Sequence, residues 1–135
     1  MKEIIQKAFI CFFAFSLTGF GATYTVDDNG PADFSIIQTA ILVCSSGDTI
    51  IVKPGIYKGT GNRDIDFQGK NIVIRSIDPN DPNIVAQTII DCNGWVSQYH
   101  RGVYFHSNES SSSVVAGLTT SHPKTLRSKM TIQPS

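Results

Sequence analysis

Short runs of β-favouring residues alternate with turn residues along most of the chain. The runs are three to five residues long, and Gly, Asn, Asp, Pro or Ser separate them. Such spacing predicts short strands joined by turns, and therefore an all-β class. After a first strand signal that begins at Tyr24, the runs lie at residues 49–53, 72–75, 88–91, 103–107 and 114–118.

Residues 34–44 have the spacing of an amphipathic helix instead, and this is the only helix that the pattern predicts after residue 22. Asp33 is placed to cap the amino terminus of this helix, and Gly47 to cap its carboxyl terminus. A helix with one apolar face must bury that face, so we expect it to cover another part of the chain. The apolar stripe consists of Phe34, Ile37, Ala40, Ile41 and Cys44.

Three of the predicted strands resemble one another in sequence. Residues 50–53 (IIVK) and 72–75 (IVIR) lie 22 residues apart and agree in kind at every position. Residues 103–107 (VYFHS) parallel 72–76 (IVIRS) in the same way. Repeats of this length are typical of solenoids, in which each unit stacks on its neighbour. An antiparallel sandwich is the alternative, although only Asn93-Gly94 has the character of a tight hairpin turn.

The solenoid makes specific predictions about which side chains share a column. Lys53 and Arg75 are expected to share an outward-facing column, because they occupy the same place in the repeat. Pro54-Gly55 is expected to form a type II turn, with glycine supplying the positive φ. The interior column is predicted to stack Ile50 and Val52 above Ile72 and Ile74.

The first residues of the chain, 1–22, read as a secretory signal. Lysines precede an apolar-dominated segment at 8–20. Gly19, Gly21 and Ala22 supply the small residues for cleavage, which is expected near Gly21 or Ala22. A transmembrane anchor is the alternative, but it needs roughly 20 apolar residues. We therefore expect an exported protein that is secreted, periplasmic or on the cell surface, with no membrane segment after cleavage.

Charge and cysteine content narrow the picture further. The chain carries 11 basic and 11 acidic residues, so it lacks the basic excess that a nucleic-acid partner requires. Removal of residues 1–22 takes Cys11 with it and leaves Cys44 and Cys92. These two can form a disulfide in an oxidising compartment or lie as separate buried thiols, and we favour the thiols. Neither has metal-ligand spacing around it.

Residues 33–57, DFSIIQTAILVCSSGDTIIVKPGIY, resemble the amino-terminal cap and first coil of pectin-lyase-like proteins. Residues 61–76 and 100–107 also resemble coils of this group, and the resemblance extends over about 24–119. It implies a right-handed parallel β-helix whose open end is covered by the amphipathic helix. It also implies that Pro54-Gly55 bends the chain around the first corner and that Tyr57 packs beyond it.

The end of the chain departs from this family. Residues after Thr119 have no strand pattern, and we interpret them as a truncated or frame-shifted end rather than the disordered tail of a short protein. The expected organisation is a signal at 1–22, a first strand and capping helix at 23–48, the first coils at 49–119 and an irregular basic tail at 120–135.

The resemblance implies a polysaccharide as the partner but assigns no reaction. Members of the family cleave acidic polysaccharides by β-elimination with a basic residue and calcium, or by hydrolysis with paired carboxylates. No residue here matches a catalytic motif of the family, so none is assigned a catalytic role and no cofactor is expected, although a full-length relative could use calcium. The alternatives are a non-catalytic, adhesin-like surface solenoid and a fragment without independent function.

Several residues could still carry chemistry. Asp64 and Asp66 alternate with apolar residues, so both carboxylates could face outward and hold calcium or act as acid and base. The simpler interpretation is a solvent-facing pair near Arg63. Asp91 could also bind calcium, but it is more simply a turn residue before Asn93.

The segment around residue 100 contains the other candidates. His100, Arg101 and His106 are possible bases, and Arg101 could abstract a proton from a uronic acid. Trp95 and Tyr99 could stack on a sugar ring. The simpler interpretations are surface residues for the first group and ordinary loop packing for the two aromatic residues.

Overall fold

The computed structural model describes residues 19–93 and 98–122. Most of the predicted signal, most of the predicted basic tail and Trp95 lie outside the described residues. Residues 120 and 121 were predicted to begin the irregular tail, but they belong to a strand, Thr119–Ser121, because their backbone pairs in parallel with Thr88–Asp91. No helix within the described ranges is long and apolar enough to cross a membrane.

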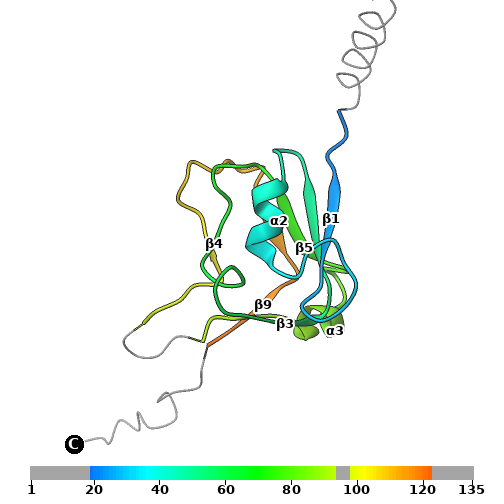
Figure 1. Ribbon diagram of the computed structural model, residues 1–135, viewed down its shortest axis with the longest axis vertical. Helices are drawn as coiled ribbons and strands as arrows, with labels where there is room; N and C mark the ends of the chain where they lie inside the picture. The colour runs from blue at the N-terminus through cyan, green and yellow to red at the C-terminus, as the bar shows by residue number, and fades with distance from the viewer. Residues whose placement is uncertain (1–18, 94–97, 123–135) are drawn as a thin grey trace, which may run out of the picture.

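The described chain is rich in strands that pair in parallel, which confirms the β-rich class and excludes the antiparallel sandwich (Figure 1). A four-stranded sheet has the order β1-β2-β5-β8, a three-stranded sheet has β3-β6-β9, and β4 pairs with β7. The strands are β1 (Thr23–Val26), β2 (Thr49–Val52), β3 (Gly55–Lys58), β4 (Ile65–Asp66), β5 (Val73–Ser76), β6 (Thr88–Asp91), β7 (Val103–Tyr104), β8 (Val114–Ala116) and β9 (Thr119–Ser121).

The chain visits the three sheets in turn. It runs from β2 through β3 and β4, returns to the first sheet at β5, and continues through β6 and β7 to β8 and β9. Figure 1 shows the four-stranded sheet on the right, the three-stranded sheet below and β4 on the left, with helix α2 (Ile37–Val43) lying over the middle. Segments far apart in the sequence therefore enclose one apolar interior.

The prediction for the interior column names the correct inward-facing residues but the wrong pairing between β2 and β5. Ile50 pairs with Ile74 and Ile51 with Arg75, so the pairing of Ile50 with Ile72 is shifted by two residues. A shift of two leaves each side chain on the same face of the sheet. All four predicted interior residues are accordingly buried: Ile50, Val52, Ile72 and Ile74.

Two further predictions from the repeat are wrong. Lys53 and Arg75 share no column, because Arg75 pairs with Ile51 while Lys53 lies beyond the end of β2 and its N–H donates to Val26. Residues 103–107 are not the next copy of 72–76 either, since β7 pairs with β4 and the strand beside β5 is β8. The reason is that short alternating runs look alike in every sheet, and only the connections decide which sheet a run joins.

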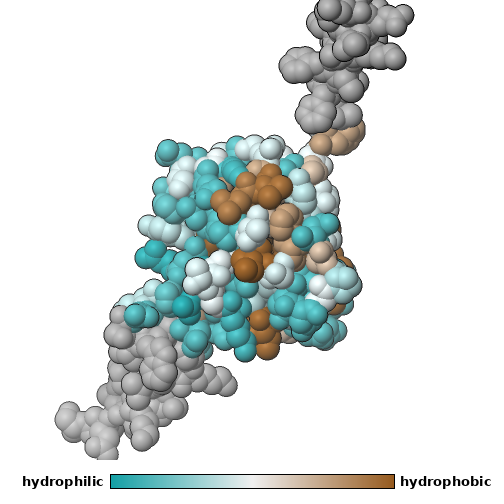
Figure 2. All heavy atoms as spheres, in the orientation of Figure 1, coloured by the Kyte–Doolittle hydropathy of each residue, from teal (hydrophilic) through white to brown (hydrophobic). Residues whose placement is uncertain are grey.

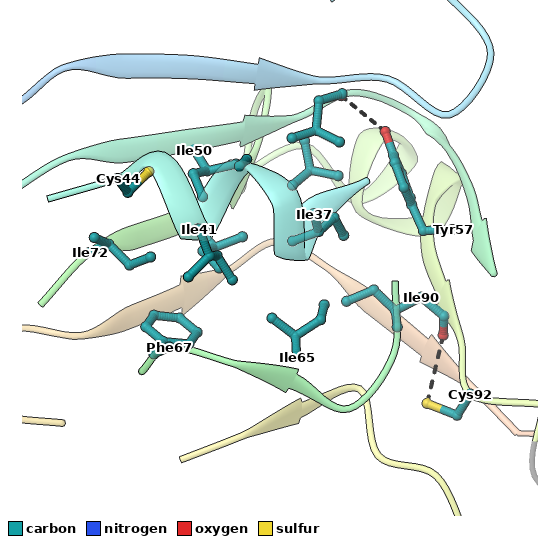
Figure 3. Packing of buried hydrophobic residues seen from close by; sticks show 14 residues of the cluster. Ile37, Ile41, Cys44, Ile50, Tyr57, Ile65, Phe67, Ile72, Ile90 and Cys92 are labelled. Atoms are coloured by element: carbon teal, nitrogen blue, oxygen red, sulfur yellow. Dashed lines mark hydrogen bonds between the residues drawn. The ribbon is translucent and has the colours of Figure 1, made fainter. Parts of the chain in front are cut away.

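Helix α2 covers the interior as predicted, and we call it the lid helix. Ile37, Ala40 and Ile41 on its inner face are fully buried, and the helix packs against β1, β2 and β4. Figure 3 shows Ile37 and Ile41 pointing at the side chains of Ile65 and Phe67 below them. The stripe of apolar residues therefore closes one end of the enclosed core.

The ends of the lid helix are not capped as predicted. The helix begins after Ile36, which makes no side-chain cap, and Asp33 instead accepts hydrogen bonds from the Thr25 N–H and hydroxyl at 2.8 Å each. Gly47 has a φ of 100° but lies in the turn after the helix, whose last cap residue is Cys44. Sequence spacing thus identified the helix but not its boundaries.

Residues outside the helix form hydrogen bonds with the N–H groups of its first turn and the carbonyl groups of its last turn. The Ile37 N–H donates to Asn62 Oδ1 at 2.9 Å, and the Gln38 N–H donates to the Gly61 carbonyl at 2.9 Å. At the other end, Lys70 Nζ donates to the carbonyls of Ile41 at 2.6 Å and Leu42 at 3.2 Å. Tertiary contacts therefore replace local caps.

A second helix, α3 (Pro82–Gln87), was not predicted. Asp81 caps it by accepting from the Asn83 N–H at 2.9 Å, and Pro82 occupies its first turn. An Asp-Pro pair is a standard start signal for a helix. The signal was present, but no residue of this helix is buried, so it has no apolar stripe to detect.

The Pro54-Gly55 corner differs from the predicted type II turn. Gly55 is the first residue of β3 and is not among the glycines with positive φ. Glycine is needed here because a larger residue does not fit: a Cβ at this position would lie 2.2 Å from Asp28 Oδ1. Beyond the corner Tyr57 is fully buried, as expected, and its hydroxyl lies 2.8 Å from the Lys53 carbonyl oxygen and 3.1 Å from that of Val26.

Cys44 and Cys92 are separate buried thiols, as we favoured. Burial, together with the charge of Asp48, raises the pKa of Cys44 to about 11. The thiol therefore stays protonated at neutral pH and serves as a small apolar side chain of the core.

Candidate binding site at the β4–β7 corner

Strands β4 and β7 bring two distant segments side by side. Ile65 pairs with Val103 and Asp66 with Tyr104. Ile65 is fully buried, and because successive side chains alternate, Asp66 and Tyr104 face outward together. This pairing creates an outer face that carries a carboxylate and an aromatic ring.

Two carboxylate–imidazole pairs join these segments. Asp64 Oδ2 lies 2.5 Å from His100 Nδ1, and Asp66 Oδ2 lies 3.3 Å from His106 Nε2. Asp64 Oδ1 also accepts from the Arg101 N–H at 2.8 Å. The carboxylates therefore hold the 100–106 segment against β4.

A stack of planar groups crosses the same face. The Arg101 guanidinium carbon lies 4.5 Å from the centre of the Tyr104 ring, and the Tyr104 and His106 rings stack with centres 4.1 Å apart. A guanidinium over an aromatic ring is attracted by the ring quadrupole. Tyr104 remains 41% exposed, so the stack reaches the surface. We call Asp64, Asp66, His100, Arg101, Tyr104 and His106 the corner site.

Asp64 has an unusual backbone and a shifted pKa. Its φ of 50° is in the left-handed region, which Asp tolerates better than most residues. Burial raises the pKa of its carboxyl, but the hydrogen bonds from Arg101 and His100 and the nearby positive charges outweigh this, so the pKa lies below its usual range. Asp64 is therefore ionised at neutral pH and can attract its imidazole partner.

Glu109 fixes the chain on either side of the corner site. It accepts from the Gly69 N–H at 3.1 Å and from the Ser107 N–H at 2.8 Å. Burial raises its pKa, but these backbone hydrogen bonds and the charge of His106 outweigh burial, and the pKa lies below its usual range. The turn after β4 and the residues after β7 are thus held at a set separation.

The structure brings together residues that the sequence presented separately. Asp64, Asp66 and Arg101 meet in one place, together with both predicted histidines. Tyr99 is 86% exposed and directly precedes His100. Trp95 lies outside the described residues, so its predicted stacking role stays a prediction.

Other candidates have simpler roles. Asp91 ends β6 and accepts from the Asn93 N–H at 3.0 Å, as the turn interpretation expects. Arg63 reaches the carbonyls of Cys92 at 3.3 Å and Asn93 at 3.2 Å. Both residues therefore shape the connection after β6.

Sequence reasoning missed Tyr104 and Glu109. An aromatic residue at an outward strand position was a usable signal for Tyr104, because Val103 beside it reads as inward. Nothing in the sequence pointed to Glu109, because its partners are the backbone N–H groups of Gly69, 40 positions away, and Ser107, two positions away.

Residues 19–93 and 98–122 contain no group of three or more His, Cys, Asp or Glu side chains placed to hold a metal ion. The carboxylates of Asp64 and Asp66 accept hydrogen bonds from the chain itself. A calcium role for these two residues stays a prediction.

Comparisons with protein-family models, curated proteins and solved structures found no match for this chain. The chemistry of the corner site is therefore the guide to its function. Its carboxylates can accept hydrogen bonds from hydroxyls, its guanidinium can donate, and its rings offer apolar surface.

Proposed function

We propose that these strands are the first coils of a right-handed parallel β-helix. The supporting features are the three parallel sheets, the order in which the chain visits them, and the lid helix over one end of the interior. A stack of this kind leaves the outward side chains of successive strands in rows, which suits the binding of an extended ligand.

We propose further that the protein is exported and binds an extracellular polysaccharide at the corner site. The observation that carries this proposal is the exposed Arg101–Tyr104–His106 stack beside the carboxylates of Asp64 and Asp66. Sugar recognition commonly combines aromatic surface with fixed hydrogen-bonding groups, because a sugar ring has both apolar faces and polar edges.

The groups of the site are held in place before any ligand arrives. Asp64 and Asp66 are fixed by imidazole and backbone donors, and the stack fixes the Arg101 side chain. Within the described part of the chain, the Arg101 guanidinium forms no ion pair, and we propose that its N–H groups donate to the ligand. Pre-ordered side chains lose less entropy on binding.

Affinity electrophoresis against neutral and uronate polysaccharides tests the proposal. Retardation of the exported protein by one of these polymers is expected. Replacing Tyr104→Ala should weaken binding about tenfold, because the stack loses its central ring. Arg101→Gln should weaken it as well, because it removes the positive charge and the guanidinium plane while keeping a polar side chain.

Leu42→Ala is the matched control, since Leu42 is an apolar side chain, 59% exposed, on the lid helix rather than at the corner. It should leave retardation unchanged. Absence of retardation by every polymer would contradict polysaccharide binding and favour the adhesin-like spacer. Equal retardation of Tyr104→Ala and the parent chain would move any binding site away from the corner.

The proposal is binding without turnover, because no residue here is assigned a catalytic role. We expect no release of unsaturated product from polygalacturonate in the presence of calcium. Absorbance of the unsaturated product measures this directly, and clear turnover would show that the corner site, or another part of the chain, is catalytic.

A further inference from the structure

Asp48 is a buried carboxylate with no cationic partner in the described part of the chain. It is only 7% exposed. Its Oδ1 accepts from the Ala22 N–H at 2.7 Å and its Oδ2 from the Ser45 N–H at 2.8 Å. None of the ion pairs among residues 19–93 and 98–122 includes it. A buried charge is favoured when it is both hydrogen-bonded and paired with an opposite charge, and Asp48 has the hydrogen bonds without the pair.

The donor to this carboxylate lies at the predicted cleavage site. Cleavage between Gly21 and Ala22 leaves a small residue, Gly21, on the last position before the cut and another, Gly19, two positions earlier. Cleavage after Ala22 would instead place Phe20 at the second of these positions. Signal cleavage sites carry small residues at both. The sequence therefore favours the Gly21–Ala22 bond.

The structure around this bond agrees with that choice. Phe20 is 95% exposed, and no atom lies within 4 Å of the place where a Cβ of Gly19 would be. Ala22 is held by its N–H to Asp48 and by its carbonyl, which accepts from the Thr49 N–H at 2.8 Å. The ordered hydrogen bonding thus begins at Ala22.

We propose that a signal peptidase cleaves the Gly21–Ala22 bond and that the new α-ammonium group of Ala22 forms an ion pair with Asp48. Water adds across the peptide bond, Gly21 leaves as a carboxylate, and the Ala22 nitrogen becomes an amine that takes up a proton at neutral pH. The same nitrogen already lies 2.7 Å from Asp48 Oδ1. The proposal rests on the export step of the proposed function but not on polysaccharide binding.

The ion pair would anchor the start of β1 to the turn before β2. Hydrogen bonds between an ammonium and a carboxylate are stronger than those between an amide and a carboxylate. Cleavage would therefore stabilise the exported form relative to the precursor.

Amino-terminal sequencing of the full chain after export from a secreting host tests the cleavage. The mature protein should begin with Ala-Thr-Tyr-Thr. A start at Thr23 or later would overturn the proposal, because the nitrogen that contacts Asp48 would then be absent.

Two recombinant chains test the ion pair itself, one beginning at Ala22 and one beginning at Gly21. The second keeps the Ala22 N–H as an amide but moves the charge one residue away. The Ala22 chain should have the higher Tm, by several degrees, and the difference should shrink above about pH 8 as the α-amine loses its proton.

Asp48→Asn in both chains completes the comparison. With asparagine at this position the two chains should unfold at nearly the same temperature. If the difference in Tm between them persists, or if it is absent with Asp48 in place, the ion pair is wrong. Both results are independent of polysaccharide binding, so a failure of the proposed function can be told apart from a failure here.

Discussion

The lid helix and the corner site are two regions of one small molecule that use their side chains in opposite ways. The inner face of the lid helix is apolar and fully buried, and its outer face, shown in Figure 2, carries a group of exposed apolar residues that includes Leu42 and Val43. The corner site presents charged and aromatic groups to solvent. Burial of apolar surface supplies folding free energy, whereas exposed fixed polar groups supply recognition.

The two regions are nevertheless connected through Gln38. Its side-chain Nε2 donates to the Asp66 carbonyl at 2.9 Å, and its Oε1 accepts from the Asp66 N–H at 2.9 Å. The lid helix thus satisfies both backbone groups of a strand residue whose carboxylate belongs to the corner site. Gln38 therefore helps to fix the position of Asp66 in the corner site.

Emptying the space under the lid helix should have the largest effect on stability. Ile41→Ala removes a fully buried side chain and should cost about 2–5 kcal/mol of unfolding free energy. Urea denaturation measures this cost. Leu42→Ala, its exposed neighbour, should change stability by no more than about 0.5 kcal/mol. Similar losses for both variants would mean that the lid helix does not close the core.

Removing the connection between the regions should have an intermediate effect. Gln38→Ala leaves both Asp66 backbone groups without their partner and should cost about 1–3 kcal/mol. It should also weaken polysaccharide binding, whereas Ile41→Ala measured well below its unfolding temperature should not. Gln38→Glu keeps an acceptor for the Asp66 N–H but sets a carboxylate oxygen against the Asp66 carbonyl oxygen, so it should also be less stable than the parent.

Acid should destabilise the fold through the carboxylates of Asp64 and Glu109. The pKa values of Asp64 and Glu109 lie below their usual range in the folded protein, so their contribution to stability is present above the ordinary carboxyl pKa of about 4 and is lost as the pH falls through the folded values. The Tm should therefore fall below about pH 4. This fall should be shallower in Asp64→Asn and Glu109→Gln.

Breaking a single exposed pair should have the smallest effect on stability. Asp64→Asn at neutral pH should cost less than about 1 kcal/mol, because solvent screens the pair with His100. Thermal unfolding at low and high salt measures it, and the difference between parent and variant should narrow at high salt. A loss as large as that of Ile41→Ala would show that the corner, and not the lid, holds the fold together.

Much of the architecture could be read from local patterns. The stripe from Ile37 to Ile41 predicted a helix with a buried face, and the alternation around Ile50 and Ile74 predicted which side chains point inward. The candidate site was predictable only as scattered residues. Asp64 and His100 are 36 positions apart, and nothing local to either indicates the other.

The sequence by itself determined most of the strands, which of their faces are apolar, and that the helix buries one face, because these follow from side-chain periodicity. It did not predict β3 or β9, and the placement of the helix over an open end was implied by the resemblance to pectin-lyase-like proteins. Only the tertiary structure decided that β5 lies beside β8, that β7 joins β4, and that Arg101, Tyr104 and His106 stack. The physical reason is that parallel strands far apart in the chain are brought together by the connections between them. Sheet membership and register therefore depend on loop length and corner geometry, which the short, similar strands do not encode.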